Sequence, residues 1–127
     1  MMLKAPAVRI LVIDDEPAVV DVLVTCLREE GYAALGAETG DEGLKLAILS
    51  RPELVLLDIA LPGMNGIELL KRIRSIIPTT RVIVVSGNTD PVLAREALEL
   101  GALAYVDKPF DFAYLKRVIA MTLGEGV

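Results

Sequence analysis

Residues suited to phosphoryl chemistry stand at the ends of four short apolar runs in this chain. Asp14, Asp58 and Ser86 follow the runs ILVI, LVLL and VIVV, and Lys108 follows the run around Tyr105. If the runs are neighbouring strands of one parallel sheet, their carboxyl ends meet at one edge, where open α/β sheets place their sites. The sequence therefore predicts that two carboxylates, a hydroxyl and an ammonium group meet at that edge.

The acidic segment Asp14-Asp15-Glu16 is expected beside Asp58. Two carboxylates about 5 Å apart repel by roughly 3 kcal/mol at an effective dielectric of 20. Such a cluster therefore needs a cation or must keep some of its protons. Oxygen ligands without Cys or His select a hard cation, and Mg²⁺ takes one or two carboxylates and bridges to phosphate oxygens. The segment is equally typical of a solvated helix N-terminus, where acids favour the helix dipole.

Asp58 directly follows the apolar run Leu54–Leu57 and precedes Leu61-Pro62-Gly63, a loop that leaves its carboxylate at the sheet edge. A carboxylate there can attack phosphorus and carry an aspartyl phosphate. An aspartate can also simply end a strand in a turn. Lys108 could neutralise a transferred phosphoryl group and Ser86 could donate a hydrogen bond to it. Taken alone, either residue is more often a surface residue.

Composition excludes several classes of function. A chain of 127 residues predicts one domain with a single core, and 54% hydrophobic but only 4% aromatic residues predict an aliphatic core. The formal net charge of −5 argues against direct nucleic-acid binding, because a basic surface is missing. The sequence has no histidine, which excludes a Ser-His-Asp triad, a His-ligated zinc site and a phosphohistidine of its own.

Cysteine and hydropathy patterns bear on the compartment. Cys26 is the single cysteine and cannot form an intrachain disulfide, and no apolar run approaches the roughly 20 residues of a membrane span. Residues 1–7 are short and broken by Lys4 and Pro6, so we expect no signal peptide there. These features predict a cytoplasmic protein without a membrane partner.

Short β-branched runs alternate with helical patterns, which is typical of a βα repeat. Strands are expected near Arg9–Ile13, Ala33–Ala37, Leu54–Leu57, Arg81–Val85 and Ala104–Val106. Helices are expected from Pro17 to before Gly31, from Thr39, from about Gly66 to before Pro78, from Pro91 and after Asp111. Their spacing predicts that the buried faces carry Val19, Leu23, Cys26 and Leu27; Leu44, Ala47 and Ile48; Leu69, Leu70 and Ile73; Leu93, Ala97 and Leu98; Leu115, Val118 and Ile119.

Right-handed crossovers between these strands predict an α/β fold, a doubly wound five-stranded parallel sheet with five helices on both faces. Two strand orders are common for such sheets, and the pattern alone does not choose between them. We expect one domain over residues 1–127, with a core of about 8–123 and short termini outside it.

The chain resembles the receiver domain of two-component response regulators over almost its whole length. The resemblance rests on four motifs in order, which are Val12–Glu16, Leu57-Asp58 with Leu61–Gly66, Val84–Gly87, and Gly101-Ala102 through Tyr105 to Lys108-Pro109-Phe110. It implies the flavodoxin-like strand order 2-1-3-4-5. It also implies a phosphorylation-activated signalling switch, which is not an enzyme beyond its own phosphorylation and dephosphorylation.

The resemblance assigns the acids. Asp58 would accept a phosphoryl group from a histidine of a partner kinase. Asp14 and Asp15 would hold Mg²⁺ with Asp58, Asp15 being the favoured direct ligand and the backbone carbonyl of Ala60 a further one.

The resemblance also assigns a switch. Ser86, where threonine is commoner, and Lys108 would contact the phosphoryl group, and Tyr105 matches the aromatic residue that turns inward on activation. The Lys108-Pro109 bond would be cis, which is inexpensive only before proline. The positions of Ala60 and Asn88 vary within the family, so they leave the lifetime of the phosphorylated state open.

The partners implied are a sensor histidine kinase or phosphotransfer protein, and a downstream target or output domain that contacts the fourth helix, fifth strand and fifth helix. Homodimerisation through the fourth and fifth helices is possible for this family. Solvated helix faces explain the charged residues there equally well, and these are Arg95, Glu96, Lys116 and Arg117.

Three other classes compete on the same residues. A haloacid-dehalogenase-like phosphatase needs a second acid two residues after its nucleophile, where this chain has Ala60. A flavodoxin-type FMN binder needs a Ser/Thr/Gly-rich phosphate loop after the first strand, where this chain has acids. A receiver-like interaction module that works without phosphorylation would not need the complete acid set.

Overall fold

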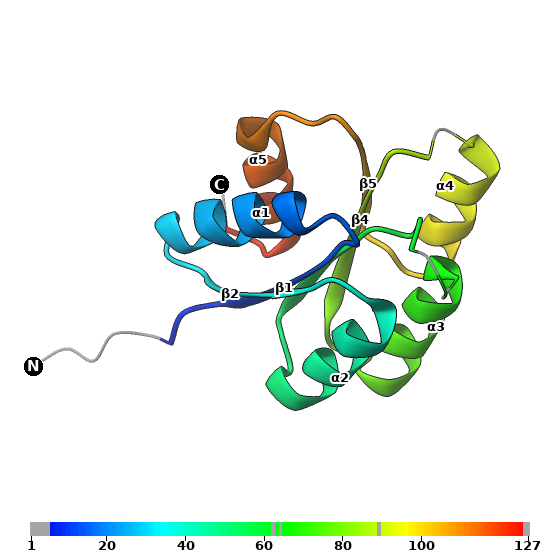
Figure 1. Cartoon of the computed structure of the whole chain (residues 1–127), viewed down its shortest axis with the longest axis horizontal. Coiled ribbons are helices and arrows are strands. Elements are labelled where there is room, and N and C mark those ends of the chain that lie inside the picture. Colours follow the sequence, from blue (N-terminus) through cyan, green and yellow to red (C-terminus); the bar gives the residue numbers. More distant parts are fainter. Residues whose placement is uncertain (1–5, 62, 64, 89, 126–127) are drawn as a thin grey trace, which may run out of the picture.

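The computed structural model describes residues 6–61, 63, 65–88 and 90–125 (Figure 1). Lys4, Pro62 and Met64, which the sequence analysis used, lie outside the described residues. Strands and helices alternate along the described chain in the order β1 (Arg9–Ile13), α1 (Pro17–Glu29), β2 (Ala33–Ala37), α2 (Gly40–Ser50), β3 (Leu54–Leu57), α3 (Gly66–Ile76), β4 (Arg81–Ser86), α4 (Pro91–Glu99), β5 (Ala104–Asp107) and α5 (Phe112–Thr122).

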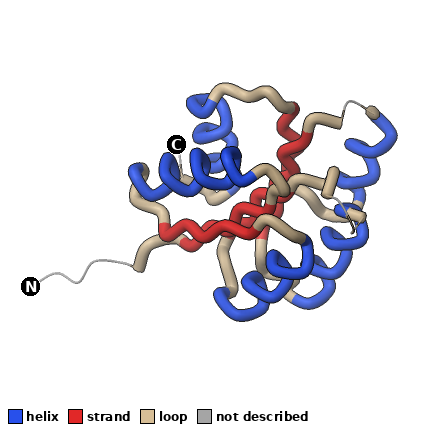
Figure 2. Tube along the Cα trace, in the orientation of Figure 1, coloured by secondary structure: helices blue, strands red, loops and turns tan. Residues whose placement is uncertain are grey.

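The five strands form one parallel sheet in the order β2-β1-β3-β4-β5. This is the flavodoxin-like order that the resemblance implied. The helices cover both faces, with α1 and α5 on one side and α2, α3 and α4 on the other (Figures 1 and 2). The predicted fold class is therefore confirmed.

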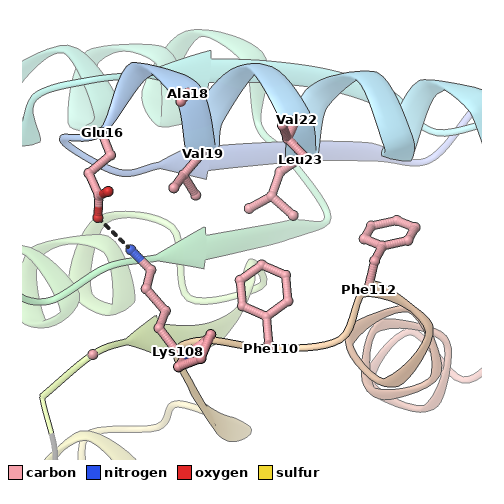
Figure 3. A pocket seen from close by; sticks show the side chains of 10 residues that line it. Glu16, Ala18, Val19, Val22, Leu23, Lys108, Phe110 and Phe112 are labelled. Atoms are coloured by element: carbon pink, nitrogen blue, oxygen red, sulfur yellow. Dashed lines mark ion pairs between the residues drawn. The ribbon is translucent and has the colours of Figure 1, made fainter.

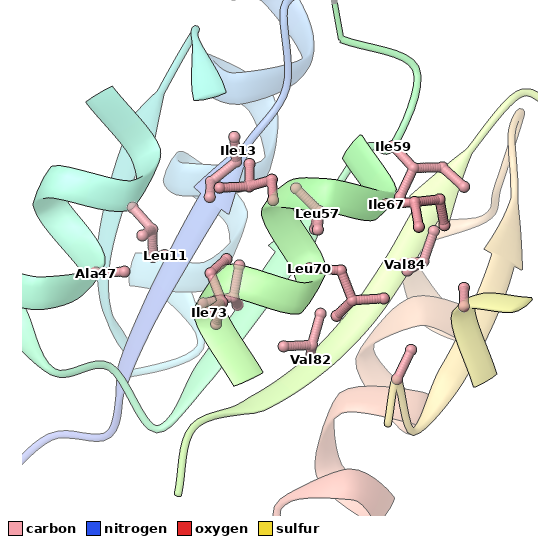
Figure 4. Close-up of a cluster of buried hydrophobic side chains, with 14 of the residues drawn as sticks. Leu11, Ile13, Ala47, Leu57, Ile59, Ile67, Leu70, Ile73, Val82 and Val84 are labelled. Carbon is pink, nitrogen blue, oxygen red and sulfur yellow. The ribbon is translucent and has the colours of Figure 1, made fainter. Parts of the chain in front are cut away.

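Each face of the sheet has its own aliphatic core. Alternate side chains of β1 point to opposite faces, so Leu11 and Ile13 pack toward α2 and α3 (Figure 4). Ile10 and Val12 pack with residues of α1 and α5 on the other face. Burial on both faces is the reason that the strands are near-continuous apolar runs.

Two predicted core residues lie at the surface. Ile48 of α2 is 39% exposed and Leu98 of α4 is 47% exposed. The fully buried residues of these helices are small, with Gly43 and the predicted Ala47 in α2 and the predicted Ala97 in α4. The predicted Leu44 and Leu93 pack against the core in partly buried positions. A Cβ on Gly43 would lie only 2.6 Å from Ile13 Cδ1, so α2 packs too closely for a larger side chain there.

Most predicted helix starts are confirmed by capping contacts. The side chains of Thr39, Asn65, Asp90 and Asp111 each accept a hydrogen bond from a backbone N–H in the first turn of the following helix. Strands β4 and β5 each run one residue further than predicted, because Ser86 and Asp107 extend their ladder. None of the helices in the described part of the chain has the length and hydropathy needed to cross a membrane.

Candidate functional site

The sheet register brings the predicted site residues to one edge. Ile13 pairs with Leu57, and the Asp58 N–H donates to the Ile13 carbonyl over 2.9 Å, so Asp14 and Asp58 leave neighbouring strands at the same level. Ser86 ends β4, and its carbonyl accepts a 3.0 Å hydrogen bond from the Lys108 N–H. The topology therefore assembles residues that are up to 94 positions apart in the sequence.

Lys108 joins the two buried carboxylates. Its Nζ donates to Asp14 Oδ2 over 2.6 Å and to Asp58 Oδ2 over 3.0 Å. Asp14 is 3% exposed and Asp58 is 5% exposed, so both ion pairs are largely shielded from water. Glu16 forms a third ion pair with Lys108 at 3.6 Å, but its side chain is mostly exposed. The ammonium group is thus the positive centre of the site.

The remaining oxygens of the two buried carboxylates are held by the backbone. Asp14 Oδ1 accepts from the Glu16 N–H and Asp58 Oδ1 accepts from the Ala60 N–H, both over 2.9 Å. Each aspartate therefore bonds to the amide two residues on, which fixes its side chain in a tight local turn. In the described part of the chain, every buried side-chain oxygen and nitrogen has a hydrogen-bond partner.

Gly66 lets α3 begin close behind Asp58. A Cβ at this position would collide with backbone atoms of Ile59, the residue after Asp58. The side chain of Asn65 accepts a hydrogen bond from the Ile67 N–H and caps the helix at this approach. The loop after β3 is consequently packed against the start of α3.

Burial and ion pairing act in opposite directions on the titration of the site. Burial raises the pKa of the Asp14 carboxyl, and the hydrogen bond from Lys108 offsets part of that rise. Burial alone would lower the pKa of Lys108, but its hydrogen bonds to Asp14 and Asp58 outweigh burial and raise that pKa. The ammonium therefore stays charged at neutral pH.

The acids also satisfy the chemistry of a magnesium site. Carboxylate oxygens of Asp14, Asp15 and Glu16 lie within 4.8 Å of one another, and Asp58 is joined to Asp14 through Lys108. Oxygen donors without nitrogen or sulfur are the set that Mg²⁺ prefers. The residues present therefore fit the predicted ion.

Ser86 and Tyr105 meet through the backbone of Asn88. The fully buried Ser86 Oγ accepts from the Asn88 N–H over 3.3 Å, and the Tyr105 hydroxyl donates to the Asn88 carbonyl over 2.9 Å. Both predicted switch residues are thus tied to the loop between β4 and α4. Both contacts use backbone groups of Asn88, which almost any residue type would provide at this position. The sequence therefore could not predict this connection.

An apolar pocket of about 690 Å³ opens next to the site, between α1 and the segment from Lys108 to Phe112. Figure 3 shows Val19 and Leu23 of α1 facing the rings of Phe110 and Phe112, with the Glu16–Lys108 ion pair at one end. Sequence reasoning did not anticipate this pocket or the role of Glu16 as a partner of Lys108. The Lys108-Pro109 bond beside it adopts the expected cis form.

Comparison with known proteins agrees with this geometry. The model of the response regulator receiver domain family matches residues 10–120. Sporulation initiation phosphotransferase F of Bacillus subtilis is 37% identical over 87% of this chain and 90% of its own length. The transcriptional regulatory protein KdpE of Mycobacterium tuberculosis is 43% identical over 80% of this chain, which spans only 44% of that relative.

Solved structures show the same relationship. A CheY-like response regulator receiver domain protein from Methanospirillum hungatei superposes with a TM-score of 0.91 at 34% identity, covering 94% of this chain and 95% of the other. Fold, site and sequence therefore lead to one conclusion. The chain belongs to the response regulator receiver domain family and is a phosphorylation-activated switch of two-component signalling.

Proposed function

We propose that Asp58 is the phosphoacceptor of this receiver domain. The observation that carries the proposal is the position of its buried carboxylate, held between the Lys108 ammonium and the Ala60 amide at the edge where β1, β3 and β4 end. An ammonium group beside the nucleophile can follow the negative charge onto a transferred phosphoryl group. Asp14 has the same burial but is the more tightly paired with Lys108, which supports a role in holding charge.

The proposed donor is a phosphohistidine on a sensor histidine kinase or phosphotransfer protein. An Asp58 carboxylate oxygen attacks phosphorus, and the phosphorus–nitrogen bond to the donor imidazole breaks. The imidazole nitrogen keeps the electron pair and takes up a proton, and an aspartyl phosphate is formed. Attack of water on that phosphorus later releases inorganic phosphate and restores the carboxylate. These two reactions on itself are the only catalysis that we propose for the chain.

We infer that the cofactor is Mg²⁺, held by Asp14, Asp15, Asp58 and the backbone carbonyl of Ala60. The clustering of acidic oxygens at this edge supports the inference. When bound, the ion would offset negative charge on the transferred phosphoryl oxygens. Lys108 supplies the positive charge that the protein itself contributes.

The proposed output surface consists of α4, β5 and α5. Ser86 would turn from the Asn88 N–H toward the phosphoryl oxygens, and Tyr105 would leave the Asn88 carbonyl for the space behind Ser86. Such a local electrostatic change biases a two-state element. The surface and the turn before β5 offer exposed apolar side chains for a target or an attached output domain, and these are Val92, Leu98, Leu103 and Tyr114. Pairing of two activated copies through α4 and α5 belongs to the same proposal.

We further propose that residues 1–127 form one receiver domain with a core of about 8–123, acting in the cytoplasm without contacting nucleic acid or a membrane. The described elements run from Arg9 to Thr122, which supports that core.

The pocket beside Lys108 suits the donor protein, because a surface seated there would bring its histidine next to Asp58.

Acetyl phosphate with Mg²⁺, followed by intact mass spectrometry, tests the phosphoacceptor. The parent is expected to gain the mass of one phosphoryl group, and Asp58→Asn is expected to gain none. Asp107→Asn is the matched control, because Asp107 is an exposed carboxylate at the end of β5 on the same edge. An Asp58→Asn variant that is phosphorylated as fully as the parent would show that another residue is the acceptor.

A further inference from the structure

Strand β2 forms one free edge of the sheet, because β1 is its only neighbour in the described fold. Its sequence, Ala33–Ala37, contains no charged residue, and the Leu35 side chain is 42% exposed. A free apolar edge strand can pair with another chain, and proteins usually protect such edges. The protection of this edge must therefore come from outside the strand.

The register identifies which backbone groups of β2 face away from the sheet. The Ala33 N–H donates to the Val8 carbonyl over 2.8 Å, and the Ala37 carbonyl accepts from the Asp14 N–H over 3.1 Å. Ala33 and Ala37 therefore direct their groups toward β1. Because backbone groups alternate along a strand, Ala34 and Gly36 direct theirs toward the free edge.

Arg28 covers one of these outward groups. Its Nη2 and Nε donate to the Ala34 carbonyl over 2.8 and 3.2 Å. Arg28 lies in the last turn of α1, where a basic side chain could instead bond to carbonyls at the end of its own helix. The guanidinium group extends beyond the end of its helix to β2, where both of its donors bond to the Ala34 carbonyl oxygen.

The packing of α1 on β2 makes this reach possible. A Cβ on Gly36 would collide with Val20 and would lie 3.3 Å from Val24 Cγ2, so only glycine lets the helix lie this close to the strand. Gly36 therefore fixes α1 over the edge, and the last helical turn places Arg28 beside Ala34. The two contacts act together, since both depend on the same close approach.

We infer that Arg28 closes the β2 edge against strand addition and so prevents a second copy of this chain from pairing through it. The occupant of an unguarded edge would be β2 of the second copy. Two identical antiparallel strands form a self-complementary pair about a two-fold axis. Ala33 is exposed and Gly36 is half-buried, whereas Ala34 is only 3% exposed beneath the Arg28 contact. Removing Arg28 would uncover the Ala34 carbonyl, and the strand itself has no charge to repel its copy.

Sedimentation velocity of unphosphorylated protein without Mg²⁺, over a wide range of concentration, tests the inference. The parent is expected to stay monomeric, whereas Arg28→Met is expected to associate as its concentration rises. Methionine keeps an aliphatic stem to pack against the strand and removes the donors. Arg72→Ala is the matched control, because Arg72 is an exposed helix arginine paired only with Glu68 at 3.8 Å in the described contacts. Its association behaviour should match that of the parent.

Two further measurements locate the association. Adding Leu35→Lys to Arg28→Met places a charge on the edge and is expected to restore the monomer. In associated Arg28→Met, the outward amides of Ala34 and Gly36 should become protected from hydrogen exchange. Thermal unfolding by circular dichroism shows whether each variant is folded, and Arg28→Ala, which also removes the donors, replaces Arg28→Met if that variant is not. A monomeric Arg28 variant, association that Leu35→Lys leaves unchanged, or unprotected edge amides would each overturn the inference.

Discussion

Replacing Lys108 by methionine keeps a side chain of similar length but removes a positive charge. In the described part of the chain, no other positive charge contacts both buried carboxylates. Lys108 Nζ lies 2.6 Å from Asp14 Oδ2 and 3.0 Å from Asp58 Oδ2, so these oxygens are at most about 5.6 Å apart. At an effective dielectric of 20, two unit charges at that separation repel by about 3 kcal/mol. We therefore expect Lys108→Met to lower the free energy of unfolding at pH 7 by about 3 kcal/mol, the lower end of the range for a broken buried ion pair.

Urea unfolding followed by circular dichroism in the presence of a chelator measures this effect. Lys116→Met is the control, because Lys116 pairs with Glu30 at 2.9 Å on the surface and such pairs contribute at most about 1 kcal/mol. The double variant Lys108→Met/Asp58→Asn should recover most of the lost stability, since it removes one of the repelling charges. A Lys108→Met variant no less stable than Lys116→Met would refute the reasoning, as would a double variant no more stable than Lys108→Met.

The pH dependence of the stability lost in Lys108→Met tests the electrostatic cause independently. Burial raises the pKa of Asp14 in the folded protein, so protonation of this carboxyl favours the folded state. Without Lys108 that pKa should rise further. The difference in stability between the parent and Lys108→Met should therefore shrink as the pH falls from 7 toward the usual aspartate range, and a difference that grows on acidification would contradict the electrostatic cause.

Three further predictions concern other groups. Asp15→Asn should weaken Mg²⁺ binding and slow phosphorylation without lowering metal-free stability, and unchanged affinity in isothermal titration would count against its ligand role. Ser86→Ala should still be phosphorylated but shift only partly toward the active state in NMR spectra with beryllofluoride, because one charge-assisted hydrogen bond contributes about 1.5–3 kcal/mol and a full population reversal needs roughly 5.5 kcal/mol. Burial and the 2.8 Å hydrogen bond to Glu125 raise the pKa of Tyr32 to about 12. Because this pKa is higher in the folded protein, the protonated Tyr32 hydroxyl contributes stability that is complete below pH 10 and is lost as the pH rises through 12. The stability of Tyr32→Phe, measured by alkaline unfolding, should not show this loss between pH 10 and 12.

Strand positions and the convergence of the site could be predicted because both depend on patterns that are local in sequence. A strand buried on both faces is an apolar run, and a parallel sheet brings the ends of such runs together. The positions of Asp14, Asp58 and Ser86 at the ends of apolar runs therefore predicted where the site would form. The strand order could not be predicted from hydropathy, because the pattern of apolar runs is the same for either common order. Only the motif resemblance distinguished the two orders.

Helix faces could be predicted less well, because spacing alone favours large apolar side chains as core residues. In α2 and α4 the small residues Gly43 and Ala97 are buried, whereas the larger Ile48 and Leu98 are exposed at the surface. A hydropathy pattern does not identify a glycine as a core residue, although the glycine determines how closely its helix can pack on the sheet. The guanidinium contact of Arg28 was missed for the same reason, since it depends on how closely α1 approaches β2.

The ion pairs that Lys108 makes with Asp14 and Asp58 should oppose activation of the site. Lys108 stabilises two buried carboxylates before phosphorylation, and the same ammonium is proposed to bind the phosphoryl group afterwards. These roles compete, because an ammonium has three donors and two of them already hold Asp14 and Asp58. A phosphoryl group on Asp58 can keep its share of this contact, whereas the shorter bond to Asp14 must weaken if Lys108 moves toward the new oxygens. The strength of the Asp14–Lys108 pair should therefore help to determine how completely phosphorylation shifts the domain toward its active state.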